Sequence, residues 1–240
     1  LTANPDGTFI YVAAANYVGP DAFTYRVSDG ELDSDLATVA ITVTPVNDAP
    51  EVVSPLADVT LGEDAAAIAV NLTGVFADVD TADVLTFSVT GNDNATLVDA
   101  VLDGSTLILT PRADQHGTAT LTIRATDAEG AFAEDDLQLT VTAVNDSPSF
   151  SKGADQVVLE DAGPETIAGW ASAISPGPAN ENGQTVQFLL IGNTNPGLFA
   201  SAPTVGSDGT LTFTPAPEAF GTAVLTLVLQ DDGGTANGGL

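Results

Sequence analysis

One short stretch occurs twice in this chain and constrains its fold more than any other feature. Residues 44–50 read TPVNDAP and residues 142–148 read TAVNDSP. The final prolines, Pro50 and Pro148, lie 98 positions apart. Each copy follows an alternating apolar run and precedes a new strand-like segment. An element that recurs at domain-sized spacing between two strands indicates a linker between tandem modules.

Paired glycines indicate the same repeat. A first glycine opens a strand-like run at Gly7, Gly104 and Gly209. A second glycine follows 12 or 13 positions later, at Gly19, Gly117 and Gly221. Each second glycine precedes a run that ends in aspartate, at Asp29, Asp127 and Asp231. Three copies in register predict three related modules.

The apolar runs have the character of strands, because they are short, rich in Val, Thr, Leu, Ile and Phe, and bounded by turn residues. We therefore predict an all-β fold of tandem immunoglobulin-like Greek-key β-sandwiches. Residues 1–48 are expected to form the second half of a module, 49–146 a complete one, and 147–240 one that lacks its last strand. In the third module we expect strands at 157–159 and 165–171, with Trp170 as a core aromatic in the latter.

The charge of the chain limits its partners. It has 33 acidic and 4 basic residues, a formal net charge of −29. Nucleic acid and anionic membrane surfaces are excluded, because almost nothing can neutralise their phosphates. No stretch approaches the roughly 18 apolar residues that a membrane span needs, so we expect no membrane insertion. The chain also contains no Cys and no Met, so we expect no thiolate metal site and a fragment of a longer polypeptide.

The carboxylates gather at predicted strand ends and linkers. Asp78 and Asp80 follow the second strand of the complete module, and Asp127 follows the sixth. In a Greek-key sandwich these ends lie at the pole of the N-terminal linker, so they should converge with Asn47 and Asp48. The far end of the first strand should likewise bring Glu63 to the second linker, at Asn145 and Asp146.

Several carboxylates at one pole repel one another unless a cation joins them. Oxygen ligands without His or Cys suit Ca²⁺, which takes six to eight oxygens in flexible geometry. Mg²⁺ prefers a tight octahedron with retained water, and Zn²⁺ and copper prefer other ligands. The alternative is an acidic surface that serves only solubility or salt tolerance.

These motifs resemble the cadherin-like repeats of large bacterial surface proteins and adhesins, over essentially the whole chain. The linkers resemble the cadherin Asp-x-Asn-Asp-x-Pro linker, and Asp78-x-Asp80 resembles its Asp-x-Asp motif. Glu63 and Glu160 match the first-strand Glu, and residues 121–127 resemble the Leu-x-Val-x-Ala-x-Asp segment. The resemblance implies Ca²⁺ at the module junctions, neighbouring modules as partners, and an extracellular location on the bacterial surface.

The chain also departs from that pattern. Pro45 and Ala143 replace the leading linker Asp, and the Asp-Arg-Glu motif is missing. The third module has no Asp-x-Asp, although Glu181 and Asp231 could still serve the second junction. We therefore expect fewer ions per junction than in animal cadherins, and a stiffer first junction.

Other functions find less support in the sequence. The single His116 lies in a predicted surface loop, and no nucleophile elbow, phosphate loop or dinucleotide fingerprint is present, so we expect no enzyme. A glycan- or protein-binding module would need exposed aromatics, for which Tyr17 is a candidate. Homophilic cell adhesion is the remaining alternative.

Overall fold

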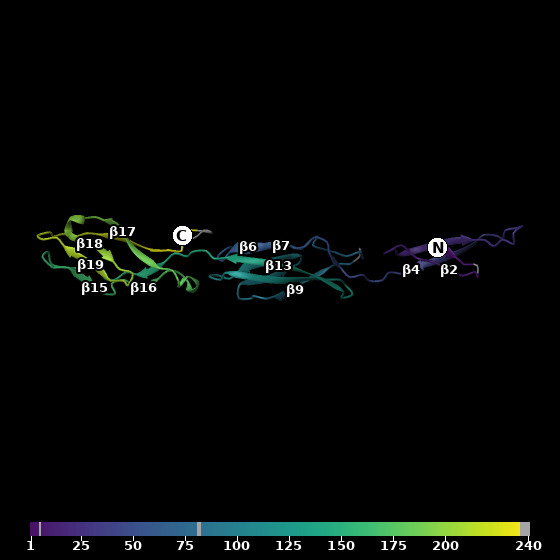
Figure 1. Cartoon of the computed structure of the whole chain (residues 1–240), viewed down its shortest axis with the longest axis horizontal. Coiled ribbons are helices and arrows are strands. Elements are labelled where there is room, and N and C mark those ends of the chain that lie inside the picture. The colour runs from purple at the N-terminus through teal and green to yellow at the C-terminus, as the bar shows by residue number, and fades with distance from the viewer. Residues whose placement is uncertain (5, 81–82, 236–240) are drawn as a thin grey trace. The chain divides into compact units, whose positions relative to one another are not determined.

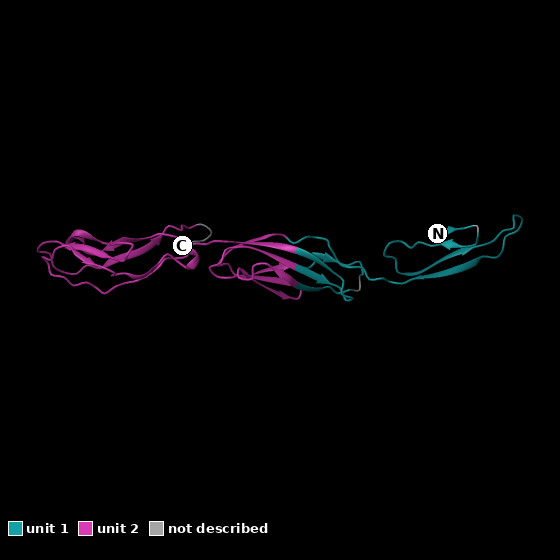
Figure 2. Cartoon of the chain, turned by 60° about the horizontal axis from the view of Figure 1, so that its bottom comes forward, with its two compact units in different colours: residues 1–56, 72–88, 123–135 teal, residues 57–71, 89–122, 136–240 magenta. Residues whose placement is uncertain are grey.

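The computed structural model describes residues 1–4, 6–80 and 83–235 (Figure 1). Across these residues the fold is all-β, as predicted, with two short 3-10 turns and no α-helix. None of the helical segments is long and apolar enough to cross a membrane. The chain divides into two compact units, shown in Figure 2: residues 1–56, 72–88 and 123–135 form one, and residues 57–71, 89–122 and 136–240 form the other.

The segment before the first linker is built on one hairpin. Its strands are β1 (Thr2–Ala3), β2 (Phe9–Ile10), β3 (Gly19–Tyr25) and β4 (Ala37–Val43). β3 and β4 pair antiparallel along their full length, and β1 pairs with β2. The rings of Phe9, Phe23 and Tyr25 pack together, with the Phe9 centroid 4.9 Å from Phe23 and 5.4 Å from Tyr25.

The segment between the linkers contains nine strands among its described residues. They are β5 (Glu51–Val52), β6 (Val59–Gly62), β7 (Ile68–Asn71), β8 (Phe76–Ala77), β9 (Thr86–Asn92), β10 (Val98–Asp103), β11 (Thr106–Pro111), β12 (Gly117–Thr126) and β13 (Phe132–Thr142). One sheet has the order β10-β11-β7 and another the order β6-β13-β12-β9. β6 pairs with β13 in parallel, with Thr142 opposite Gly62. The second linker, which follows β13, therefore begins beside the end of β6.

Alternation of apolar residues builds the core of the second unit. Leu107 and Leu109 of β11, Leu121 of β12, and Leu137 and Leu139 of β13 are all fully buried. The intervening side chains are less buried, which is the pattern of strands with one face on a core. Because the buried leucines come from both sheets, this core is the interior of a β-sandwich.

The segment after the second linker contains seven strands and the two 3-10 turns among its described residues. They are β14 (Ser149–Ser151), β15 (Glu165–Ile167), β16 (Ser172–Ser175), η1 (Ala179–Glu181), β17 (Val186–Asn193), η2 (Pro196–Leu198), β18 (Phe199–Val205), β19 (Leu211–Pro215) and β20 (Leu225–Asp231). The predicted third module ends in residues 236–240, which lie outside the described residues. Its small buried core is Ala171, Val205, Leu211 and Phe213.

Two strand predictions for this segment are wrong. Residues 157–159 form no strand, whereas their counterpart β6 is held by pairing with β13. In the described part of the chain, no strand pairs with residues 157–159 in the way that β13 pairs with β6. The predicted strand 165–171 ends at Ile167, because Gly169 adopts a φ of +63° and starts a turn. Trp170 therefore lies in a turn, although it packs against the core as predicted, and its Nε1 donates to the Ala154 carbonyl.

One loop conformation occurs three times. A non-glycine residue with φ of 57° or 58° stands three positions before a glycine with φ between 133° and 140°. The pairs are Asn16 with Gly19, Asp114 with Gly117, and Glu218 with Gly221. The second pair matters for the site, because Asp114 acts electrostatically on the second linker.

Candidate cation sites at the two linkers

The first linker is bound by carboxylates from two other segments of its unit. The Asn47 amide Nδ2 donates to Asp127 Oδ2 at 2.9 Å, and the Asp48 backbone N–H donates to Asp80 Oδ2 at 2.8 Å. Asp80 in turn donates its backbone N–H to Asp78 Oδ1 at 2.9 Å. All five residues predicted for this junction therefore lie in one hydrogen-bonded or closely spaced group.

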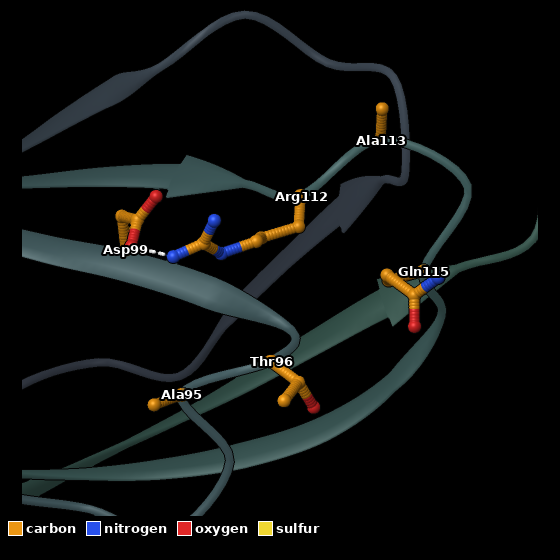
Figure 3. Close-up of a pocket in the computed structure, with 6 residues that line it drawn as sticks. All are labelled: Ala95, Thr96, Asp99, Arg112, Ala113 and Gln115. Atoms are coloured by element: carbon orange, nitrogen blue, oxygen red, sulfur yellow. Dashed lines mark hydrogen bonds and ion pairs between the residues drawn. The ribbon is translucent and has the colours of Figure 1, made fainter.

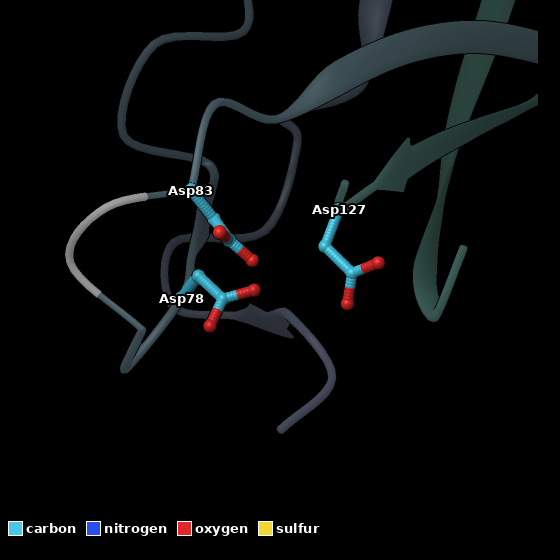
Figure 4. A group of neighbouring side chains, drawn as sticks. All are labelled: Asp78, Asp83 and Asp127. Atoms are coloured by element: carbon cyan, nitrogen blue, oxygen red, sulfur yellow. The ribbon is translucent and has the colours of Figure 1, made fainter. Parts of the chain in front are cut away.

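Three carboxylates meet beside this linker. One oxygen from each of Asp78, Asp83 and Asp127 lies within 4.8 Å of the others (Figure 4). Asp127 is only 5% exposed, and the Oδ2 atoms of Asp78 and Asp83 are buried without a hydrogen-bond partner among the described residues. Sequence reasoning missed Asp83. Its signal was its position three residues after Asp80, in the same acidic segment.

Hydrogen bonds keep Asp127 ionised. The Asn47 amide is the main cause that lowers the pKa of Asp127 below its ordinary value, and the backbone N–H groups of Ala131 and Gly130 add to the effect. The pKa of Glu129 is raised, chiefly by the charge of Asp83. The site is therefore a region of negative potential around a carboxylate that does not readily take up a proton.

At the second linker, Glu63 is the central buried group, with 1% exposure. Its Oε1 accepts the Val144 backbone N–H at 2.9 Å. The Asn180 amide Nδ2 donates to both Glu63 oxygens, at 3.2 and 3.1 Å. His116 Nδ1 lies 3.7 Å from Glu63 Oε2. Sequence reasoning missed Asn180, because its approach to Glu63 depends on the conformation of the turn that carries it.

The linker residues themselves bind the segment that follows. Asn145 donates from Nδ2 to Asp231 Oδ1 at 3.0 Å, and the Asp146 backbone N–H donates to Glu181 Oε1 at 2.9 Å. Gln184, which was also missed, donates from Nε2 to Asn145 Oδ1 at 2.8 Å. The residues predicted for this junction are thus brought together as well.

Three oxygens of this group are buried without a hydrogen-bond partner among the described residues: Asp146 Oδ2, Glu181 Oε2 and Gln184 Oε1. The pKa of Asp146 is raised, first by its burial and then by the charges of the surrounding carboxylates, Asp64, Glu181, Asp114 and Glu63. A cavity of about 160 Å³ adjoins the group and is lined in part by His116, Glu181 and Gln184.

No Lys or Arg side chain compensates either group. The sequence contains four Lys and Arg residues, and each forms an ion pair with a carboxylate outside both groups. The pairs are Arg26 with Asp33, Arg112 with Asp99, Arg124 with Glu134, and Lys152 with Asp155. Unpartnered buried oxygens and uncompensated charge fit a bound cation, and donor sets without sulfur fit Ca²⁺.

A larger hollow of about 550 Å³ has a different character (Figure 3). Its lining includes Arg112, whose guanidinium contacts Asp99 at 2.6 Å, and both side chains are about half exposed. The remaining lining residues are Ala95, Thr96, Ala113 and Gln115. A solvated ion pair beside small neutral side chains offers no activated nucleophile.

Several of the solved structures similar to the chain are animal cadherins. The EC21-23 repeats of human CDH23 are 16% identical, with a TM-score of 0.48 over 90% of this chain and 75% of that one. Drosophila N-cadherin EC1-4 is 14% identical, with a TM-score of 0.39 over 91% of this chain and 59% of that one. The human Desmocollin-1 ectodomain is 14% identical, with a TM-score of 0.35 over 97% of this chain, which spans 46% of that ectodomain. No curated protein matches the chain.

A family model described as a cadherin-like domain matches residues 1–44 and again residues 46–142. The two matches together cover more than half of the sequence, and the boundary between them falls in the first linker. Domains of this kind are extracellular adhesion modules that typically bind calcium and neighbouring domains. The chain belongs to the cadherin-like domain family.

Proposed function

We propose that this chain is a structural stalk segment of an extracellular bacterial adhesin or surface protein, in which Ca²⁺ bound at the linkers fixes successive modules. The modules are residues 1–48, 49–146 and 147–240, and their partners are calcium ions and one another. The chain has no enzymatic role in this proposal.

The observation that carries the proposal is the meeting of Asp78, Asp83 and Asp127 beside the first linker, where two buried oxygens have no hydrogen-bond partner in the part of the chain that the structure describes. Those three carboxylates would hold the ion. Asn47 and Asp48 would join the linker to it, because they already contact Asp127 and Asp80. Glu63, Asn145, Asp146, Glu181 and Asp231 would serve the second linker in the same way.

The proposed mechanism is linkage between binding and order. An ion that binds only the ordered linker stabilises it by mass action, and at 100 times its dissociation constant adds about 2.7 kcal/mol. Extracellular modules bind Ca²⁺ with dissociation constants of about 10⁻⁴–10⁻³ M. The linkers would therefore stay flexible in a low-calcium cytosol and become ordered after secretion.

Small-angle scattering with and without Ca²⁺ tests the proposal. We expect chelation to broaden the distribution of interatomic distances, since carboxylates without an ion repel one another. D127N should remove most of the response. D103N is the matched control, because Asp103 is an exposed aspartate in the β10–β11 turn. Identical scattering in Ca²⁺ and in chelator would rule out the stiffening role.

Recognition of a glycan or protein, or homophilic adhesion, has less support. The Tyr17 hydroxyl donates to the Pro20 carbonyl of its own loop, so the proposed ligand-stacking ring is held by internal structure. We expect no saturable binding of the chain on a glycan array. We also expect the same sedimentation coefficient at low and high protein concentration in Ca²⁺.

A further inference from the structure

The turn between β16 and β17 contains an asparagine that is directly followed by a glycine, Asn182 and Gly183. No other asparagine in the described part of the chain precedes a glycine. The 3-10 turn η1 ends at Glu181, and Asn182 follows it with a φ of −56° and a ψ of −12°. Both residues of the pair are exposed, so solvent reaches them from the folded chain.

The peptide group that joins Asn182 to Gly183 is not tied by hydrogen bonds. Within the described residues, the Gly183 N–H donates to no acceptor, and neither the carbonyl nor the side-chain amide of Asn182 has a partner. A Cβ built at Gly183 would meet nothing within 4 Å, so there is free space around this part of the turn. Rotation of the 182–183 peptide group therefore breaks no hydrogen bond of the described structure.

Asn180 lies in the same turn but is restrained. Its side-chain Nδ2 donates to both Glu63 oxygens, at 3.2 and 3.1 Å. The N–H of the next residue, Glu181, donates to the Pro178 carbonyl at 3.0 Å. Glu181 also has a side chain, which restricts its backbone more than that of a glycine. The turn therefore contains one asparagine that is free to react and one that is held.

We propose that Asn182 is a site of spontaneous deamidation, a covalent modification whose only co-reactant is water. The Gly183 nitrogen attacks Asn182 Cγ and forms a new N–C bond. The C–N bond of the side-chain amide breaks, and ammonia leaves with the proton that the Gly183 nitrogen gives up. Water then opens the resulting cyclic imide at either carbonyl. One product is aspartate and the other is isoaspartate, in which the main chain runs through Cγ.

Isoaspartate at this position changes how the turn meets the second linker. It adds one atom to the main chain between Glu181 and Gln184, whose backbone carbonyl and N–H are hydrogen-bonded at 2.9 Å. Gln184 Nε2 donates to Asn145 Oδ1 of the linker at 2.8 Å, so a shift of Gln184 loosens that contact. The inference goes beyond the proposed function, because it requires no ion and makes the order of this linker depend on the age of the chain.

The first test is peptide mapping by mass spectrometry of the full 240-residue chain, after incubation for days in chelator. We expect conversion to isoaspartate and aspartate at Asn182, and an intact amide at Asn180. G183A should slow the conversion by roughly tenfold, a barrier increase of about 1.4 kcal/mol, because a Cβ on the attacking residue obstructs ring closure. The map separates this site from the other Asn-Gly pair, at 237–238, which lies outside the described residues.

Hydrogen exchange of the linker amides measures the consequence. In chelator, the aged chain should exchange faster than the fresh chain at 144–147 and at the same rate at 46–49. N182D adds the negative charge without lengthening the main chain, so it should exchange like the fresh chain. Equal exchange of aged and fresh chains at 144–147, or faster exchange at both linkers, would overturn the effect on the second linker.

Two results of the mapping would overturn the modification site itself. The first is an intact Asn182 amide in the folded chain under conditions that convert it in the urea-unfolded chain, because the folded turn would then protect it. The second is equal conversion at Asn180 and Asn182, because the restraint on Asn180 would then have no effect. Both measurements are made without Ca²⁺, so neither result bears on the ions of the proposed function.

Discussion

The two linkers have almost the same sequence but different surroundings. The first places Asn47 and Asp48 beside three carboxylates that come within 4.8 Å of one another. The second places Asn145 and Asp146 among carboxylates and amides, and Asn180 and Gln184 supply N–H donors to acceptors there. The first group brings three carboxylates close together, whereas in the second both oxygens of the central Glu63 carboxylate accept hydrogen bonds.

This difference predicts different responses to cation loss. Like charges at close range need a counter-ion to stay together. Amide donors satisfy carboxylates directly, and hydrogen bonds to charged groups stabilise by about 1.5–3 kcal/mol where they are sheltered from water. We therefore expect the first linker to depend on an ion for its order, and the second to keep part of its order without one.

The largest effect should come from D127N. Asp127 is the one residue that contacts the linker amide and also belongs to the carboxylate triad. Its replacement should abolish the Ca²⁺-induced rise in the thermal midpoint that the first junction contributes, measured by calorimetry in Ca²⁺ and in chelator. D103N should retain that rise. An equal rise in D127N and the unmodified chain would show that the triad holds no ion.

Removal of Ca²⁺ by a chelator should change amide exchange differently at the two linkers, and both can be measured in one sample. We expect amide exchange at 46–49 to accelerate by roughly tenfold or more, because a bound ion worth about 2.7 kcal/mol corresponds to about a hundredfold protection. Exchange at 144–147 should accelerate less, since the bonds from Val144 to Glu63 and from Asp146 to Glu181 need no ion. Equal acceleration at both linkers would contradict the comparison.

Removal of the Asn180 amide should weaken the second linker alone. N180A deletes the donor to both Glu63 oxygens, and we expect a loss of about 1 kcal/mol in chelator, because the pair is partly exposed. Urea unfolding monitored at Trp170 measures it. N180D is the sharper variant, since it places a second carboxylate against Glu63 and should destabilise more than N180A without Ca²⁺. If both variants unfold like the unmodified chain, the amide has no structural role.

The smallest effect concerns pH in the absence of ions. The pKa of Asp127 is lowered, so its contribution to stability is present above the ordinary value of 3.8 and is lost as pH falls through the folded value. The pKa of Asp146 is raised, so between 3.8 and its folded value the folded chain gains stability as pH falls. Urea unfolding in chelator at a series of pH values should show that D146N removes the gain in stability as pH falls. D127N should remove the loss in stability as pH falls. Unchanged pH profiles in both variants would contradict these assignments.

Much of this arrangement could be predicted from the sequence. Alternation in β11–β13 indicates the sandwich, and the repeated linker together with the strand ends indicates that Asn47, Asp78 and Asp127 should meet. Such inferences are possible because strand periodicity and Greek-key topology determine which strand ends lie at the same end of a sandwich.

The remainder depends on tertiary context. Asp83 joins the triad through a loop whose course no local pattern specifies. The approach of Asn180 and Gln184 to the linker depends on the 3-10 turn at 179–181 and on the space left by Gly177 and Gly233. The prediction of a strand at 157–159 is wrong for a related reason. Its counterpart at 59–62 is a strand because it pairs with β13.

The most direct test for an ion at the first linker is anomalous diffraction from crystals grown in saturating Ca²⁺. We expect an anomalous difference peak among the carboxylates of Asp78, Asp83 and Asp127, and its disappearance from crystals of D127N. Density at that position with no anomalous signal, in crystals whose other sites hold Ca²⁺, would show that these three carboxylates do not bind Ca²⁺.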